Sequence, residues 1–221
     1  MSKPSTIAID GPVASGKSTV GKRLARRLGY RFVDTGAMYR ALTWEAVRLV
    51  TDLEDEAALA RLAENTKIDI ESSEGSRVTV NGRDVTAELR SEPVERGVSP
   101  VSRVAGVRAV LVKKQQAMAA GGNIVMAGRD IGTNVLTGAD LKIYLDVSVE
   151  EQARRRYNEL LELGEEVEYQ TILDGLVRRD DIDSNRSANP LRPAEDAVRI
   201  DTDEMDEDGV VECIMKMVDE S

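Results

Sequence analysis

The segment GPVASGKS at residues 11–18 constrains the fold most strongly, because it matches the pattern G-x-x-x-x-G-K-[ST]. The apolar run TIAID at 6–10 comes directly before it and predicts a short buried strand. Residues 17–29 follow with helical spacing and end at Gly29, a typical helix C-cap, and RFVDTG at 31–36 predicts a second strand. This order of strand, glycine-rich loop, helix and strand indicates a parallel sheet covered by helices.

The period of the sequence changes between residues 67 and 90. Residues 38–66 have mostly helical spacing, but apolar and polar side chains then alternate, as in strands with one buried face. SSEGS at 72–76 predicts a turn, and Asn81-Gly82 predicts a tight two-residue hairpin turn. We therefore expect a small antiparallel insertion at 67–90, after which helical spacing returns at 102–119.

Three more strand-like runs follow, NIVMA at 123–127, LKIYLDV at 141–147 and AVRID at 197–201. Helical stretches lie between and after them, and Ser148 with Glu151 forms a capping-box pattern at the start of one helix. Together with the two strands near the N-terminus, these runs predict an α/β fold with a central five-stranded parallel sheet flanked by helices.

Segment 11–18 has the chemistry of a phosphate-binding loop, or P-loop. Gly11 and Gly16 let the backbone curl so that successive N–H groups face phosphate oxygens, and the following helix adds its dipole. Lys17 is expected to bridge the β- and γ-phosphates, and the Ser18 hydroxyl to coordinate Mg²⁺, partly through water. The predicted nucleotide-phosphate site comprises Gly11, Pro12, Val13, Ala14, Ser15, Gly16, Lys17, Ser18 and Thr19.

The composition excludes several functional classes. The formal net charge is −10, and residues 201–221 carry most of it, so no extended basic face is available to wrap a nucleic-acid polymer. With no histidine and one cysteine, Cys213, the chain has neither a Ser-His-Asp triad, nor a Cys/His nucleophile pair, nor the usual zinc ligands. The single cysteine, and the lack of a membrane-length apolar run or signal-peptide pattern, favour a cytoplasmic protein without membrane contact.

A P-loop alone is compatible with GTPases, ATPases and small-molecule kinases. The sequence lacks both the Asn-Lys-x-Asp guanine reader of GTPases and a hydrophobic strand ending in Asp-Glu, as in motor ATPases. It does have arginines after predicted strands and in the later helices, and phosphoryl transfer between two phosphorylated molecules needs such charges. The arginines are Arg40, Arg108, Arg129, Arg154, Arg155, Arg156, Arg179 and Arg186. For Arg155, a surface position on a helix is an equally good interpretation.

Five segments resemble the signature segments of bacterial cytidylate kinases, which belong to the nucleoside monophosphate kinases among the P-loop kinases. They are IAIDGPVASGKST, VDTGAMYRAL, AGRDIGT, RRDDIDSNR and NPLRPAEDAVRIDTD, and the resemblance runs from residue 6 to about 203. GRDIGT combined with DTGAMYR is much more specific than the P-loop. The insertion at 67–90 also fits, because bacterial members carry an enlarged monophosphate-binding domain with a small antiparallel sheet.

The resemblance implies that ATP and CMP or dCMP are converted to ADP and CDP or dCDP by Mg²⁺-assisted in-line displacement, with a helical lid closing over the phosphates. It implies a P-loop core at 1–36, 106–150 and 182–221, a CMP-binding domain at 37–105 and a lid region at 151–181. The expected cofactors are ATP and Mg²⁺, the expected partners are small nucleotides, and the expected state is a monomer.

The resemblance also implies roles for individual residues on the phosphates. Thr35, Tyr39 and Arg40 line the monophosphate site, with Arg40 on the phosphate itself. Arg129 and Arg186 are similar to the other phosphate-holding arginines. Arg154, with Arg156 as a further candidate, comes from the lid. The catalytic set implied in this way is Lys17, Arg129, Arg154 and Arg186.

The nucleoside is assigned to a second group of residues. Ser99, Arg108 and Asp130 align with the family's cytosine readers, with Ser102 as the alternative to Ser99, and Arg179 and Asp183 align with the pair on the pentose hydroxyls. The chemistry of the base agrees, because a carboxylate accepts from the exocyclic amine of cytosine but faces a carbonyl in uracil. Two alternatives stay open: another small P-loop kinase acting on UMP, AMP or shikimate, and a nucleotide-binding module without catalysis.

The charged stretch RRDDIDSNR at 178–186 has a specific expected geometry. Arg179, Asp183 and Arg186 are separated by four and three positions, so they share one helix face if the helix extends that far. The remaining charged residues of this stretch, Arg178, Asp180 and Asp181, fall mainly on other faces and are expected to be solvated.

Overall fold

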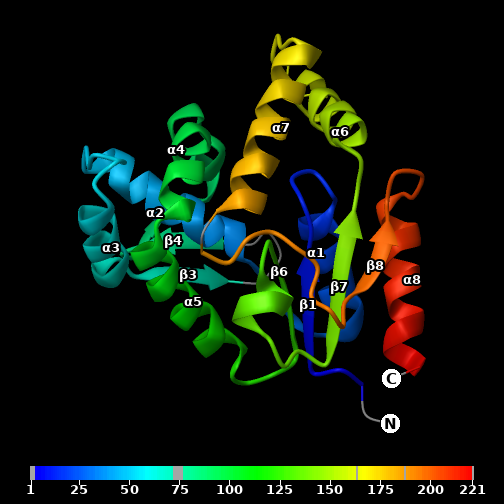
Figure 1. Ribbon diagram of the computed structural model, residues 1–221. Helices are drawn as coiled ribbons and strands as arrows, with labels where there is room; N and C mark the ends of the chain where they lie inside the picture. The colour runs from blue at the N-terminus through cyan, green and yellow to red at the C-terminus, as the bar shows by residue number, and fades with distance from the viewer. Residues whose placement is uncertain (1–2, 72–76, 163, 187, 221) are drawn as a thin grey trace.

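The computed structural model describes residues 3–71, 77–162, 164–186 and 188–220 (Figure 1). Its larger sheet consists of β1 (Thr6–Asp10), β2 (Arg31–Asp34), β6 (Ile124–Gly128), β7 (Leu141–Asp146) and β8 (Val198–Asp201). The strands lie in the order β2-β6-β1-β7-β8, and every neighbouring pair is parallel. The predicted central five-stranded parallel sheet is therefore confirmed.

Helices cover both faces of this sheet. Along β1, Ile7 and Ile9 pack with α1 (Lys17–Leu28) and α8 (Glu207–Glu220), whereas Ala8 belongs to the cluster on the opposite face. That second cluster includes residues of α5 (Ala105–Ala119) and of η2 (Ile131–Val135), a single π-helical turn. Both faces of the central strand are buried, which is why TIAID is a continuous apolar run.

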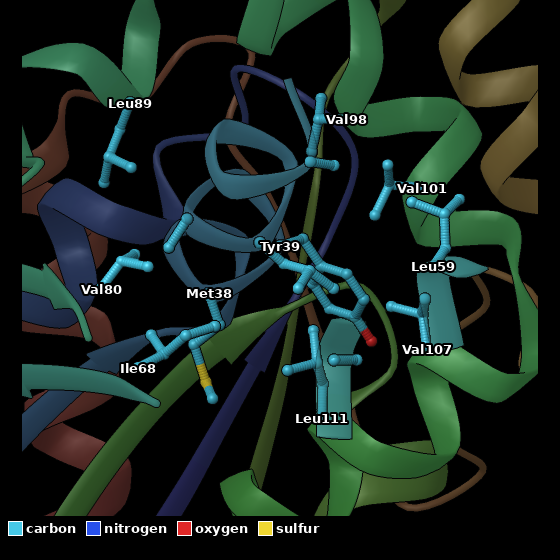
Figure 2. Packing of buried hydrophobic residues seen from close by; sticks show 14 of the residues in the cluster. Met38, Tyr39, Leu59, Ile68, Val80, Leu89, Val98, Val101, Val107 and Leu111 are labelled. Carbon is cyan, nitrogen blue, oxygen red and sulfur yellow. The ribbon is translucent and has the colours of Figure 1, made fainter. Parts of the chain in front are cut away.

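The segment between β2 and β6 contains the antiparallel insertion predicted at 67–90. It contains α2 (Thr35–Arg48), α3 (Glu56–Asn65), the antiparallel strands β3 (Ile68–Glu71), β4 (Arg77–Val80) and β5 (Arg83–Asp84), and η1 (Thr86–Arg90). Asn81 and Gly82 both have positive φ, 51° and 82°, so they form the expected tight hairpin turn. The turn expected at 72–76 lies outside the described residues. Figure 2 shows the core of this region, with Tyr39 among Val98, Val107 and Leu111.

One helix of this region had no counterpart in the sequence analysis. α4 (Glu92–Arg103) carries Pro93 in its first turn and Pro100 in its interior. An interior proline usually interrupts a helix, so the sequence did not predict one at 91–101. The helix expected at 102–119 begins only at Ala105, because Val104 adopts an extended conformation between α4 and α5. Val98 and Val101 are buried in one cluster with Met38 and Leu42 of α2, so packing stabilises α4 despite the interior proline.

Two helices stand over the carboxyl ends of the parallel strands (Figure 1). α6 (Val149–Glu162) and α7 (Tyr169–Asn185) pack together, with the rings of Tyr157 and Tyr169 edge to face at 5.9 Å. The capping box at the start of α6 is half formed, because Ser148 accepts from the Glu151 N–H, whereas the Glu151 carboxylate binds arginines instead. Within the described residues, no helix is long and apolar enough to cross a membrane.

The C-terminus of α2 contains a strained residue. Val50 has a φ of 55°, although β-branched residues rarely adopt this left-handed conformation, and its side chain is 90% exposed. The Thr51 N–H donates to the Ala46 carbonyl and the Val50 N–H to that of Val47, which is the Schellman pattern. Val50 therefore occupies the position where glycine is usually found.

Replacing Val50 with glycine should stabilise the protein. Val50→Gly relieves the left-handed conformation without losing buried surface, so we expect the free energy of unfolding to rise by about 0.5–1 kcal/mol. Urea unfolding followed by circular dichroism measures the change. Val50→Ala is the control, since alanine keeps most of the strain, and equal effects of the two substitutions would contradict this explanation.

Candidate active site

The loop between β1 and α1 has the backbone of a P-loop. Gly11 has a φ of 153° and Gly16 of 83°, and a Cβ atom at Gly11 would collide with the Leu145 carbonyl oxygen. Ala14 also has a positive φ, of 55°. Along the predicted site, Pro12, Ser15 and Lys17 are buried, Val13, Ala14, Gly16 and Ser18 are half-buried, and Thr19 is exposed on the first turn of α1.

The Lys17 ammonium group turns back onto this loop. It donates to the Pro12 carbonyl oxygen and, at 3.0 Å, to the Ser15 hydroxyl. Burial first, and then the positive charge of Arg129, hold the pKa of Lys17 well below its ordinary value. An anion that enters next to Lys17 and Arg129 would stabilise the charged form of the lysine, as a phosphate-binding site requires.

Ser18 is paired with a carboxylate that the sequence analysis did not select. Its hydroxyl donates to Asp34 Oδ2 at 2.7 Å, at the end of β2. The next residue, Thr35, is buried and donates to the Ala127 carbonyl at 2.9 Å. A hydroxyl and a carboxylate are oxygen ligands of the kind that Mg²⁺ binds beside nucleotide phosphates, so this pair fits the ion.

Asp10 connects the P-loop strand to the segment GRDIGT. Its buried carboxylate accepts hydrogen bonds from the N–H groups of Ile131 and Gly132, both at 2.7 Å. Burial raises the pKa of Asp10 to about 6, although the two backbone hydrogen bonds act in the opposite direction. The carboxylate therefore fixes the backbone that follows Arg129 and Asp130, and with it the positions of these two residues after β6.

Asp130 is the centre of a buried ionic cluster. Its Oδ2 accepts from Arg108 and, at 3.1 Å, from the Asn134 side chain, while Oδ1 lies 3.3 Å from Arg186. The Arg108 guanidinium stacks over the Tyr39 ring at 5.5 Å, and the buried Tyr39 hydroxyl has no hydrogen-bond partner among the described residues. Donors thus flank one acceptor, an arrangement that can read the edge of a base.

A second cluster gathers arginines from three elements. Arg40 on α2 donates through Nε to Glu95 at 2.9 Å, and Arg179 on α7 lies 3.5 Å from the same carboxylate. Arg129 donates to Asp183 at 3.0 Å. Burial first, and then the charges of Arg129 and Arg40, lower the pKa of Arg179 to about 10. Arg40 and Arg179 therefore share one carboxylate, and the charge of Arg129 is near enough to act on Arg179.

A cavity of about 440 Å³ lies between the P-loop and α6. Ser15, Gly16, Arg154 and Arg155 line it together with the loop that follows β8. Arg155, which the sequence left undecided between site and surface, donates to the carbonyl oxygens of Ala14 and Thr202. It therefore contacts the P-loop directly and is not a free surface residue.

Comparisons with known proteins agree with this arrangement. The sequence model of the cytidylate kinase family matches residues 7–220. The cytidylate kinase of Bacillus velezensis is 48% identical over 221 residues, covering 100% of this chain and 99% of the relative. That of a Geobacillus species is 50% identical and covers 97% of this chain and 96% of its own. This chain belongs to the cytidylate kinase family.

More distant structures agree with this chain in fold alone. An uncharacterised protein of Eubacterium ventriosum superposes with a TM-score of 0.54 at 15% identity, covering 99% of this chain and 100% of its own. A gluconokinase of Sinorhizobium meliloti gives a TM-score of 0.50 at 13% identity, covering 100% and 94%. The resemblance stated from the sequence and the predicted fold class are both confirmed.

The structure brings most of the predicted residues together, with some differences. Ser99 is half-buried on α4, but the serine whose carbonyl oxygen contacts Arg108 is Ser102, at 3.3 Å. Arg154 lies against Glu151 with 62% of its side chain exposed. Arg156 pairs with Glu159 at 2.7 Å. Within the described residues, neither of these two arginines forms a hydrogen bond or ion pair with the P-loop.

The expectation that Asp180 is solvated is wrong. Arg178 and Asp181 are exposed as expected, but Asp180 is half-buried and its Oδ1 has no hydrogen-bond partner among the described residues. Its negative charge acts on both Lys17 and Tyr144. α7 passes over the end of the sheet, so Asp180 is half-buried although it is not on the same helix face as Arg179. The periodicity of the sequence did not indicate this.

The stability of this protein should respond to the ionisation of Asp10. The folded-state pKa of about 6 lies above the ordinary value of 3.8, so the folded protein holds the proton more tightly. The resulting stability is complete below pH 3.8 and is lost as the pH rises through 6, by an amount on the order of 3 kcal/mol. Unfolding of wild type and Asp10→Asn between pH 4 and 7 measures it, because the variant lacks this component. A carbon NMR titration placing the Asp10 carboxyl near 3.8 would contradict the assignment.

Proposed function

We propose that this protein transfers the γ-phosphoryl group of ATP to CMP or dCMP, giving ADP and CDP or dCDP. The observation that carries the proposal is the adjacency of two anion sites, because Asp10, which precedes the P-loop, pairs with Gly128, which precedes Arg129 of the arginine cluster. Two phosphorylated molecules bound there would place donor and acceptor phosphates next to each other. Membership of the cytidylate kinase family favours this reaction over UMP, AMP or shikimate phosphorylation and over a non-catalytic module.

ATP is assigned to the P-loop and the cavity beside it. The backbone N–H groups of residues 11–19 and Lys17 would hold the phosphates, and the cavity beside Arg155 has room for the nucleoside. Ser18 and Asp34 would hold Mg²⁺. When bound, the ion supplies positive charge beside the transferring group. Arg154, with Arg156, is assigned to the lid, which we propose spans 151–181 and approaches the phosphates on closure.

CMP is assigned to the two ionic clusters, within a proposed CMP-binding domain at 37–105. Arg40, Arg129 and Arg186 would hold the phosphate, with Thr35 and Tyr39 beside them, and Arg179 and Asp183 the pentose hydroxyls. Asp130 would accept from the cytosine amine, while Arg108 donates to ring acceptors, with Ser99 or Ser102 nearby. We also propose a cytoplasmic monomer without nucleic-acid or membrane partners, because one chain supplies all of these groups.

The chemistry requires no strong base. An oxygen of the CMP phosphate is already ionised near neutral pH and can attack the γ-phosphorus directly. The protein contributes alignment of the two phosphates, positive charge around the transferring group, and exclusion of water when the helices close. Lys17, Arg129, Arg154 and Arg186 are the residues we assign to charge stabilisation.

A coupled ADP-release assay with CMP, dCMP, UMP, AMP and shikimate tests the proposed function. We expect CMP or dCMP to be turned over with the highest kcat/KM, and Lys17→Ala to reduce kcat by at least about 10³-fold with an unchanged melting curve. Lys22→Ala, an exposed lysine on the same helix, is the control. Preference for AMP or shikimate, or near-normal kcat in Lys17→Ala, would overturn the assignment.

Replacing the Asp130 carboxylate tests how the base is recognised. Asparagine is preferred to alanine, because a buried Arg108 without a partner would destabilise the protein by about 3–5 kcal/mol. For Asp130→Asn we expect kcat/KM to fall by roughly 10–100-fold for CMP but much less for UMP, since one charged hydrogen bond is lost. Equal losses for both nucleotides would show that Asp130 does not select the base.

A further inference from the structure

Glu95 lies between two arginines of the CMP site, although nothing above gives it a role in the reaction. It belongs to α4, whereas Arg40 belongs to α2 and Arg179 to α7, so one carboxylate joins three helices. Arg40 Nε is 2.9 Å from Oε1, and Arg179 is 3.5 Å from Oε2. The three side chains are only 20%, 22% and 26% exposed for Arg40, Arg179 and Glu95, which places the contact inside the site.

The charges around Glu95 explain why a carboxylate is needed there. Arg40, Arg129 and Arg179 lie close enough to act on one another, and like charges at this distance repel. Burial acts to raise the pKa of Glu95, but the charges of Arg40, Arg179 and Arg156 outweigh it, so the pKa lies below its ordinary value. Glu95 is therefore ionised at neutral pH and neutralises part of the cluster.

The geometry leaves the arginines available to a ligand. Glu95 takes Nε of Arg40, and within the described part of the chain the terminal nitrogens of Arg40 donate no hydrogen bond to the protein. A guanidinium held through Nε presents its two terminal nitrogens as a fork, which matches two phosphate oxygens. The carboxylate and a phosphate thus use different donors of the same side chain.

We infer that Glu95 is a positioning residue that orients Arg40 for the acceptor phosphate and links it to Arg179 on the lid-side helix α7. This inference rests on the proposed CMP site. Because Arg179 comes from α7 and Arg40 from the CMP-binding domain, the carboxylate ties the position of one to the other. The arginines are then preorganised before the nucleotide arrives, so less binding energy is spent in ordering them.

Glu95→Gln removes the charge while keeping the size of the side chain. We expect KM for CMP to rise about tenfold, with kcat and KM for ATP changed less than about twofold, because a charged hydrogen bond to one arginine is weakened. Inhibition by cytidine, which has no phosphate, should be unchanged. Glu92→Gln is the matched control, since Glu92 lies on the same helix but pairs with the exposed Arg96.

The outcomes separate this inference from the proposed function. Unchanged or tighter CMP binding in Glu95→Gln, or an equal loss of cytidine inhibition, would overturn the positioning role. If Glu95→Gln does not fold, Glu95→Asp keeps the charge but shortens its reach, and a normal KM for CMP would overturn the role in the same way. A wild-type protein that does not phosphorylate CMP would instead refute the function itself.

Discussion

The buried Asp10 carboxylate accepts two backbone hydrogen bonds, from Ile131 and Gly132, and this contact fixes the geometry of the whole site. Asp10 ends β1, so the P-loop begins at the next residue. Ile131 and Gly132 follow Arg129 and Asp130, so the same bonds fix where those two side chains leave β6. The parallel pairing of β1 with β6 brings the two loops to one edge of the sheet. The strand pairing and the Asp10 carboxylate together thus align the proposed donor and acceptor sites.

The arginines at that edge of the sheet repel one another, and carboxylates between them offset this repulsion. Arg129 pairs with Asp183, Arg186 and Arg108 with Asp130, and Arg40 and Arg179 with Glu95. Removing one partner of such a pair leaves an uncompensated buried charge, so the pairs are also structural. Lys17 differs, because its only hydrogen bonds within the described residues are to neutral oxygens of its own loop. Within the described residues Lys17 thus forms no ion pair, and an incoming phosphate can pair with it without displacing a carboxylate.

Features that depend on a short stretch of sequence were predictable. The P-loop backbone, the five parallel strands and the Asn81-Gly82 turn each follow from local residue types. Features that depend on distant contacts were not. Asp34 is recognised as a site residue only from its hydrogen bond with Ser18, which is distant in the sequence. Arg155 is recognised only because α6 places it against Ala14 of the P-loop. The acidic residues at 201–221 have no assigned function, and two of them, Asp208 and Glu212 on α8, form solvent-exposed ion pairs with Arg23 and Arg27 on α1.

The stretch RRDDIDSNR illustrates both cases. Its helix ends at Asn185, so Arg179 and Asp183 share a helical face, while Arg186 is the extended C-cap and still lies 3.6 Å from Asp183. Arg179 reaches Glu95 on α4, and the other two side chains reach Arg129 and Asp130 in the loop between β6 and η2. A rotation of α7 would therefore disturb all three contacts at once. Since α6 packs on α7, movement of either helix is mechanically coupled to the acceptor site. If the proposed lid closes over the donor phosphates, it would move the acceptor arginines at the same time, which suits a kinase that must exclude water until both nucleotides are bound.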